Sequence, residues 1–217
     1  MKKNDAGLAA LRREYQQGSL RKADVNPDPF IQFNRWLDEA IAAGVIEPNA
    51  MTLATAAADG SPSARIVLLK ECTPSGFVFY SNYLSCKGRQ LKRNPRAALV
   101  FYWVDLQRQA RVTGVVHKLS GPDSDAYFSR RPRNSQISAC ISPQSEVISS
   151  RAFLEQKFSD AETAWEGREI SRPEQWGGYR LVPAEIEFWQ GRRDRLHDRI
   201  RFSRGPDDRW TLDRLGP

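Results

Sequence analysis

The fold is decided by the stretch MTLATAAADGSPSARIVLLKECTPSGFVFYSN, residues 51–82. It holds three runs of strand-forming residues, separated by ADGS at 58–61 and TPSG at 73–76. Asp-Gly and Pro-Ser-Gly are typical of tight turns, and β-branched and aromatic residues favour strands. The stretch therefore predicts three consecutive strands joined by short turns.

The same strand signal continues outward, with helices between the strands. Strand patterns occupy residues 96–106, 108–120, 179–190, 194–204 and 209–215. Helical patterns occupy residues 29–44, 85–95, 121–132 and 152–167. Gly44 is a natural helix stop, Ser85 is a candidate N-cap, and Asn94-Pro95 ends the second helix. Short connections between many strands predict a mainly β, α+β fold: an antiparallel β-barrel decorated by helices.

Domain organisation is predicted to be simple. Residues 1–25 are polar and basic and run into VNPDPF, which indicates a loose arm. No internal repeat, low-complexity tract or long linker divides the remainder. We therefore predict a flexible N-terminal segment at 1–25 and a single domain at 26–217.

The 217-residue chain is basic, with a formal net charge of +7 and a pI of about 9.5. This excess of positive charge is typical of proteins that bind nucleic acid, an acidic membrane or phosphorylated small molecules. It is equally compatible with an enzyme whose arginines simply outnumber its acidic residues. No nucleic-acid motif, signal peptide or membrane-length apolar run is recognisable. Cys72, Cys86 and Cys140 form neither a disulfide framework nor a metal cluster. We expect a cytoplasmic protein with no metal and no membrane or nucleic-acid partner.

Four stretches are candidates for binding an anion. In the first, a strand over DRLHDRIRF places Arg195, His197, Arg199 and Arg201 on one face and Leu196, Ile200 and Phe202 on the other, with Trp189 just before. The others are ARIVLLK at 64–70, SCKGRQ at a predicted helix N-terminus, and the polar, loop-like YFSRRPRNSQISACISPQS at 127–145. Each alone fits a solvated polar surface as well as a phosphate site.

Taken together, six motifs closely resemble the pyridoxine (pyridoxamine) 5′-phosphate oxidase family: RIVLLK, SRRPRNSQISA, PQS, WGGY, EFWQG and RLHDR. The resemblance extends from LRREY near the N-terminus to DRLGP at the end. It implies a homodimer of split β-barrels with FMN bound at the dimer interface. It also implies oxidation of pyridoxamine 5′-phosphate and pyridoxine 5′-phosphate to pyridoxal 5′-phosphate, the last step of vitamin B6 salvage, with O2 reduced to H2O2.

The resemblance implies site residues for each ligand. FMN would contact one strand carrying Arg65, Ile66, Val67, Leu68, Leu69 and Lys70, together with Tyr80, Ser81, Lys87, Gln109, Gln144, Ser145, Trp189 and Arg199. The substrate phosphate would contact Lys70, Tyr127, Arg131 and Ser135. Arg195 and His197 would be the catalytic pair over the reacting end, where His197 would also assist proton removal. Arg12 and Tyr15 match a segment that folds over the site as a lid.

One residue departs from the family pattern, which usually reads Ser-Arg-Lys where this chain has Ser85-Cys86-Lys87. The missing arginine normally helps to bind the FMN phosphate. We therefore predict FMN binding weaker by a factor of about ten to a hundred, unless neighbouring Arg89 compensates. The alternative is that Cys86 is a neutral replacement that the site tolerates.

Other functions stay open at this point. One is a related flavin oxidase of the phenazine-pathway type, which keeps the flavin site without the full substrate-phosphate set. Another is a non-catalytic protein that binds pyridoxal phosphate and has lost FMN. A nucleic-acid binder is the third. Tyr127, Arg131 and Ser135, together with RLHDR, favour the vitamin B6 enzyme.

Overall fold

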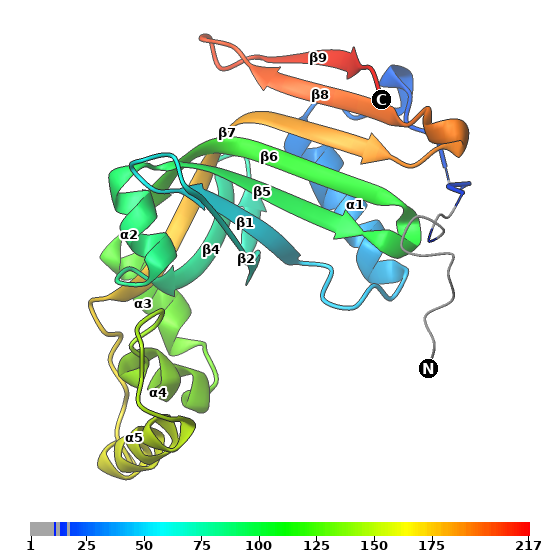
Figure 1. Ribbon diagram of the computed structural model, residues 1–217. Coiled ribbons are helices and arrows are strands. Elements are labelled where there is room, and N and C mark those ends of the chain that lie inside the picture. The colour runs from blue at the N-terminus through cyan, green and yellow to red at the C-terminus, as the bar shows by residue number, and fades with distance from the viewer. Residues whose placement is uncertain (1–10, 12–13, 17) are drawn as a thin grey trace. The chain divides into compact units, whose positions relative to one another are not determined.

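A computed structural model describes residues 11, 14–16 and 18–217 (Figure 1). In this part of the chain, nine strands form one sheet in the order β2-β1-β5-β6-β7-β4-β3, with β8 paired to β7 and β9 to β8. The same part of the chain also forms five α-helices, α1–α5. The predicted α+β class, an antiparallel sheet decorated by helices, is confirmed.

The chain divides into two compact units. Unit 1 comprises Met1–Pro48, Phe101–Arg111 and Glu185–Pro217, and unit 2 comprises Asn49–Val100 and Val112–Ala184. Three strands contribute residues to both units: β5 (Arg96–Trp103), β6 (Arg108–Lys118) and β7 (Trp176–Gln190). A single domain at 26–217 after a flexible segment stays a prediction. Among the described residues, no helix is both long and apolar enough to cross a membrane.

Unit 2 opens with the strands that the first stretch predicts, but there are four of them: β1 (Ala50–Ala56), β2 (Pro62–Leu68), β3 (Glu71–Thr73) and β4 (Gly76–Asn82). The single strand expected through Lys70 is wrong, because the chain changes pairing partner there. β2 pairs with β1 as far as Leu68. The N–H of Leu69 then donates to the Asn49 carbonyl, and the N–H of Lys70 donates to the Val78 carbonyl of β4. Lys70 therefore lies in the link between β2 and β3.

The helices of unit 2 are α2 (Cys86–Arg93), α3 (Gly121–Ser129), α4 (Arg133–Ile141) and α5 (Arg151–Ala164). Ser85 caps α2 by accepting a hydrogen bond from the Gly88 N–H, as predicted. The loop expected within 127–145 is wrong, since α4 occupies nine of its residues. Ile137 of α4 is fully buried against Phe128, Ile170 and Trp176, so tertiary packing stabilises a helix whose polar sequence shows little amphipathic pattern. Figure 1 shows α4 and α5 side by side.

Unit 1 is built around α1 (Pro29–Ala42), which begins and ends as predicted. The Asp28 carboxylate accepts hydrogen bonds from two N–H groups of the first turn. Gly44 adopts a left-handed conformation (φ 71°) just past the helix. The buried face of α1 presents Phe33 against Phe101 (ring centroids 4.8 Å apart) and Trp36 against Phe188 (5.1 Å). Such edge-to-face aromatic packing stabilises the unit beyond the area it buries.

The end of unit 1 corrects the predicted strand over 194–204. The strand β8 covers only Asp198–Arg204, followed by β9 (Trp210–Leu215). A short 3-10 turn, η4 (Arg193–Arg195), precedes it, with positive φ at Asp194 and Arg195. Leu196 is 69% exposed, whereas Ile200 and Phe202 are buried as predicted. The turn interrupts the alternation, so Arg195 does not belong to the strand face that carries Arg199 and Arg201.

Candidate functional site

Unit 2 contains a pocket of about 520 Å³. It is lined by apolar, aromatic, amide and hydroxyl groups and by cations: Ile66, Val67, Leu68, Lys70, Tyr80, Ser81, Lys87, Tyr127, Arg130, Arg131, Pro132, Ser135, Gln144 and Trp176. Four of these residues are cationic and none is acidic. Cations without neighbouring carboxylates create a positive potential that attracts anions.

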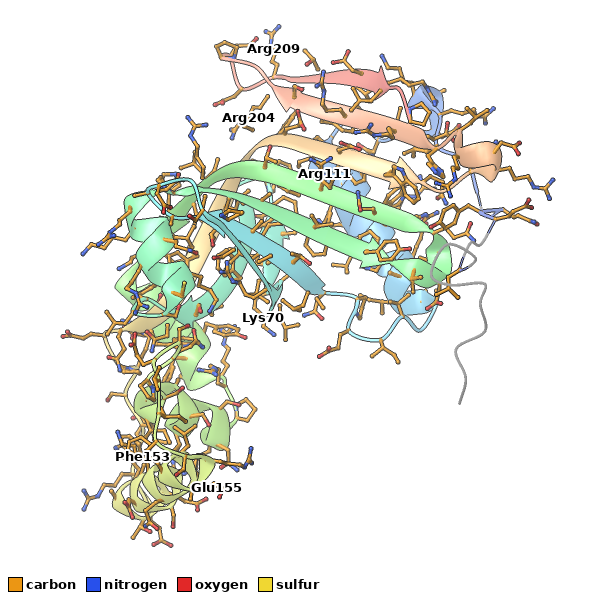
Figure 2. The ribbon with its side chains drawn as sticks, viewed as in Figure 1. Lys70, Arg111, Phe153, Glu155, Arg204 and Arg209 are labelled. Carbon is orange, nitrogen blue, oxygen red and sulfur yellow. The ribbon has the colours of Figure 1, made fainter. Side chains whose placement is uncertain are left out.

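The pocket brings together most of the residues that sequence reasoning assigned to FMN and to the substrate phosphate. Of the proposed flavin set, it gathers Ile66, Val67, Leu68, Lys70, Tyr80, Ser81, Lys87 and Gln144. Of the substrate-phosphate set, it gathers Lys70, Tyr127, Arg131 and Ser135, which is the complete group. Lys70, labelled in Figure 2, belongs to both sets and lies where the chain passes from β2 to β3.

Lys87 anchors the polar side of the pocket. Its Nζ lies 2.9 Å from Gln144 Oε1 and 3.2 Å from Ser81 Oγ. Ser81 Oγ in turn donates to the same Gln144 oxygen at 3.2 Å. Burial, with Arg65 nearby, lowers the pKa of the Lys87 ammonium. A desolvated cation whose hydrogen-bond partners are neutral and whose charged neighbour is another cation gains most from an anionic ligand.

Helix α2 holds Lys87 in place through a close backbone contact. A Cβ on Gly88 would lie 2.2 Å from the Tyr83 carbonyl oxygen, so this position requires glycine. Cys86, one residue before Lys87, is half-buried and unpaired. Arg89 lies on another face: its guanidinium donates to the Leu84 carbonyl and pairs with Glu146 at 2.6 Å. Arg89 does not line the pocket, so the compensation considered for Cys86 has no support in this conformation.

An aromatic stack forms another part of the pocket wall. Tyr80 and Tyr127 lie parallel with ring centroids 3.8 Å apart, and Trp176 is parallel to Tyr80 at 5.4 Å. The Arg131 guanidinium lies over the Trp176 ring, 4.4 Å from its centroid. Burial raises the pKa of Tyr80 to about 12. The phenol therefore stays protonated and neutral beside the cations.

Arg131 is the lining residue whose contacts best fit an anionic ligand. Its Nη1 is buried and has no hydrogen-bond partner among the described residues. Burial lowers the pKa of the guanidinium, although an arginine remains charged at neutral pH. A buried donor without a partner is unfavourable. A phosphate is an acceptor of matching charge.

Sequence reasoning missed three lining residues: Arg130, Pro132 and Trp176. Trp176 belongs to the WGGY motif, which carried the resemblance but received no role. The signal was the pair of glycines after the tryptophan. A Cβ on Gly178 would lie 2.9 Å from Tyr80 Cε1, so the glycine lets the Tyr80 ring approach β7 closely.

Unit 1 holds a second pocket, of about 500 Å³, that collects a different group of predicted residues. Its lining includes Tyr15, Trp189, Arg195 and His197. Tyr15 packs edge-on against Trp189 (5.6 Å) and His197 (5.5 Å). The segment assigned as a lid thus reaches these two residues in the described part of the chain, while Arg12 lies outside the described residues.

The local contacts of His197 define its protonation state. The backbone N–H of Arg192 donates to His197 Nδ1 at 3.1 Å. Because an N–H only donates, Nδ1 is the acceptor, and the neutral ring then carries its proton on Nε2. Burial first, and then the charge of Arg195, lowers the pKa of the imidazole. At neutral pH this geometry presents a neutral ring with a donor at Nε2.

The remaining predicted residues line neither of these two pockets: Arg65, Leu69, Gln109, Ser145 and Arg199. Arg199 forms a bidentate pair with Glu187 (2.8 and 3.1 Å), which also accepts from Arg111. Arg65 donates to the Leu53 carbonyl and to Thr55 Oγ1. In the described conformation these two arginines are occupied by the protein itself. Their assigned roles stay predictions.

A family model described as pyridoxamine 5′-phosphate oxidase matches residues 37–164. A model described as pyridoxine 5′-phosphate oxidase C-terminal dimerisation region matches residues 176–217. The chain belongs to the pyridoxamine 5′-phosphate oxidase family.

Relatives of this oxidase family are similar along nearly their whole length. The pyridoxine/pyridoxamine 5′-phosphate oxidase of Cupriavidus necator is 55% identical, over 97% of this chain and 99% of the relative. That of Nostoc sp. is 51% identical, over 98% of this chain and 100% of the relative. Among solved structures, PhzG from Burkholderia lata, in complex with tetrahydrophenazine-1-carboxylic acid, superposes with a TM-score of 0.87 at 31% identity, over 93% of this chain and 99% of that chain. The predicted split-barrel fold of the oxidase family is confirmed.

Proposed function

We propose that this chain is an FMN-dependent oxidase that converts pyridoxamine 5′-phosphate and pyridoxine 5′-phosphate to pyridoxal 5′-phosphate, with O2 as the acceptor and H2O2 as the second product. One observation carries the proposal: the unit 2 pocket has four cationic side chains, no carboxylate and a stacked aromatic wall. Two phosphorylated molecules with flat rings fit this chemistry. Membership of the oxidase family supports it.

The residues of the pocket fit FMN. Lys87, Ser81 and Gln144 offer a cation, a hydroxyl and an amide for the cofactor, and Ile66 to Leu68 offer an apolar edge. FMN, when bound, would supply the acceptor for the hydride that leaves the substrate, and O2 would reoxidise it. The protein's contribution is to hold the two rings and to exclude water.

The substrate phosphate is proposed to bind Lys70 and Arg131, with the hydroxyls of Tyr127 and Ser135. Arg131 would gain a partner for its buried Nη1. Tyr127 stacks on Tyr80, which limits the rotation of its phenol and orients its hydroxyl. Two cations with two neutral donors suit a dianion better than a monoanion.

Arg195 and His197 are proposed to orient the substrate ring and its reacting substituent. The hydrogen bond that His197 Nδ1 accepts from the Arg192 N–H favours a donor role for Nε2. It disfavours the alternative in which His197 removes a proton, because the ring would need a free lone pair at Nε2. Positioning is therefore the role that we propose.

A homodimer completes the proposal. The model that matches residues 176–217 is described as a dimerisation region. Ile66 lines the unit 2 pocket from β2 at the end of the strand order and is 64% exposed. An exposed apolar side chain at a sheet edge is typical of a surface that another chain covers. A cytoplasmic location and a lid at residues 1–25 stay predictions.

An anaerobic visible spectrum tests the proposal. Purified protein is mixed with FMN, and spectra are recorded before and after pyridoxamine 5′-phosphate is added, then after air is admitted. We expect protein-bound flavin that bleaches with the substrate and recovers in air, with H2O2 released. Bound flavin that stays oxidised would refute the substrate. Failure to bind flavin would refute the cofactor and favour a pyridoxal phosphate-binding protein.

The similarity to PhzG keeps a second candidate in view: a flavin oxidase acting on a phenazine-type ring. The two candidates differ in whether Lys70, Arg131 and Ser135 bind a substrate phosphate. Competition by inorganic phosphate separates them. It should inhibit an oxidase that grips a substrate phosphate, and it should leave a phenazine-type oxidase unaffected.

A further inference from the structure

Trp176 lines the unit 2 pocket but has no role in binding either proposed ligand. It begins β7, is 7% exposed and contacts three other members of the lining: Tyr80, Tyr127 and Arg131. Its backbone is held from two sides. Its N–H donates to the Pro173 carbonyl, and its own carbonyl accepts from Arg172 at 2.6 Å. The backbone hydrogen bonds fix the start of β7, and the ring contacts restrict the orientation of the indole.

The guanidinium of Arg131 lies over this indole, 4.4 Å from the ring centroid, and is 5.8 Å from the Phe128 ring. No carboxylate pairs with Arg131 among the described residues. Arg131 is half-buried, and a cation that has lost part of its water normally has a counter-charge. Here the π face of tryptophan is the compensating group, and a desolvated cation–π contact is one of the stronger kinds.

This choice of partner has a functional consequence. A carboxylate would hold Arg131 equally well but would neutralise it and repel a phosphate. An indole attracts the guanidinium without occupying its N–H groups, so the charge and the donors remain available. The buried Nη1 of Arg131 has no hydrogen-bond partner, as expected for a donor that stays available to a ligand.

The geometry points to Trp176 as the positioning residue for Arg131, and thereby as a determinant of selectivity for phosphorylated substrates. The inference rests on the proposed function, because it deepens the role of the same pocket. Trp176 acts through Arg131, whose guanidinium lies over its ring at 4.4 Å from the centroid. It need not touch the substrate.

A double-mutant cycle tests the inference with the full-length protein in saturating FMN. Trp176→Leu removes the π face and keeps an apolar group, while Trp176→Phe keeps a smaller π face. We expect Trp176→Leu to raise KM for pyridoxamine 5′-phosphate about three- to thirtyfold. In contrast, kcat and the FMN dissociation constant should change by less than about twofold. Trp176→Phe should recover most of the loss.

The decisive comparison is made in an Arg131→Met background, where Trp176→Leu should have little further effect on KM. An equal effect in both backgrounds would overturn the inference. So would an FMN dissociation constant that rises as much as KM, since that would indicate a general loss of packing. If the wild type does not oxidise pyridoxamine 5′-phosphate, the proposed function fails. The inference is then still decided by calorimetric titration with inorganic phosphate, whose affinity should fall in Trp176→Leu.

Discussion

Replacing Lys87 with methionine is expected to weaken FMN binding without destabilising the protein itself. The ammonium has lost water on burial, which lowers its pKa. A cation with a lowered pKa destabilises the fold while charged. Its effect is unfavourable at neutral pH and disappears only as the pH rises above the folded pKa. Methionine removes this penalty and keeps most of the volume.

The contacts of Lys87 set the expected changes in apo-protein stability and in the FMN dissociation constant. Loss of Lys87 leaves Gln144 Oε1 with a donor, because Ser81 Oγ still donates to it, while Ser81 Oγ loses the hydrogen bond that it accepts from Lys87. Two hydrogen bonds of about 1 kcal/mol each are lost, and the desolvation penalty of the ammonium is relieved. The two changes oppose each other, so we expect the apo-protein to stay within ~1 kcal/mol of the wild type. One charged hydrogen bond to an FMN phosphate is worth about 1.5–3 kcal/mol, so the dissociation constant should rise about ten- to a hundredfold.

Flavin fluorescence quenching gives the dissociation constant, and urea unfolding of the apo-protein gives the stability. Lys92→Met is the matched control, since Lys92 is exposed on the last turn of the same helix and does not line the pocket. The control should change neither quantity. An unchanged FMN dissociation constant in Lys87→Met would refute the assignment of Lys87. A loss of apo-protein stability well above ~1 kcal/mol would refute the account of its burial.

Three further predictions concern single positions. Cys86→Arg should lower the FMN dissociation constant about tenfold by adding a charged donor, measured by the same quenching titration, with Cys86→Ser unchanged; equal values for the arginine variant and the wild type would remove Cys86 as the cause of weak binding. The lowered pKa of His197 means that its contribution to stability is present above about pH 6.5 and is lost as the pH falls through its folded pKa. Urea unfolding on acidification should therefore show a smaller loss for His197→Gln than for the wild type, and an identical loss would contradict this. Gly88→Ala should destabilise the protein by about 1–3 kcal/mol in urea unfolding, because the new Cβ would meet the Tyr83 backbone oxygen, while Gly216→Ala, with open space around it, should be neutral.

Local signals were sufficient for much of the fold. The turns at ADGS and TPSG, the cap at Ser85 and the stop at Gly44 all appear where the sequence predicts them. Each depends on interactions within a few residues, so a short window carries the information. The family motifs likewise led to most of the pocket lining, because they are contiguous in sequence and specific in combination.

The sequence-based predictions were wrong where contacts between distant segments determine the local structure. The break of β2 before Lys70 follows from a change of pairing partner, from β1 to β4, that no local pattern reveals. Helix α4 depends on the burial of Ile137 against residues far along the chain. The turn before β8 needs positive φ at Asp194 and Arg195, which alternation of apolar residues does not predict.

By itself, the sequence determined the residue types, the local elements and the family: clusters of cations, turns and caps at particular places, and motifs in a specific order. Only the tertiary structure decided which of these groups meet. It brought Lys70, Lys87 and Arg131 from three separate segments into one pocket, paired Arg199 with Glu187, and placed Trp176 under Arg131. The physical reason is that pairing and burial depend on long-range packing, which determines whether a cation is neutralised by the protein or kept available for a ligand.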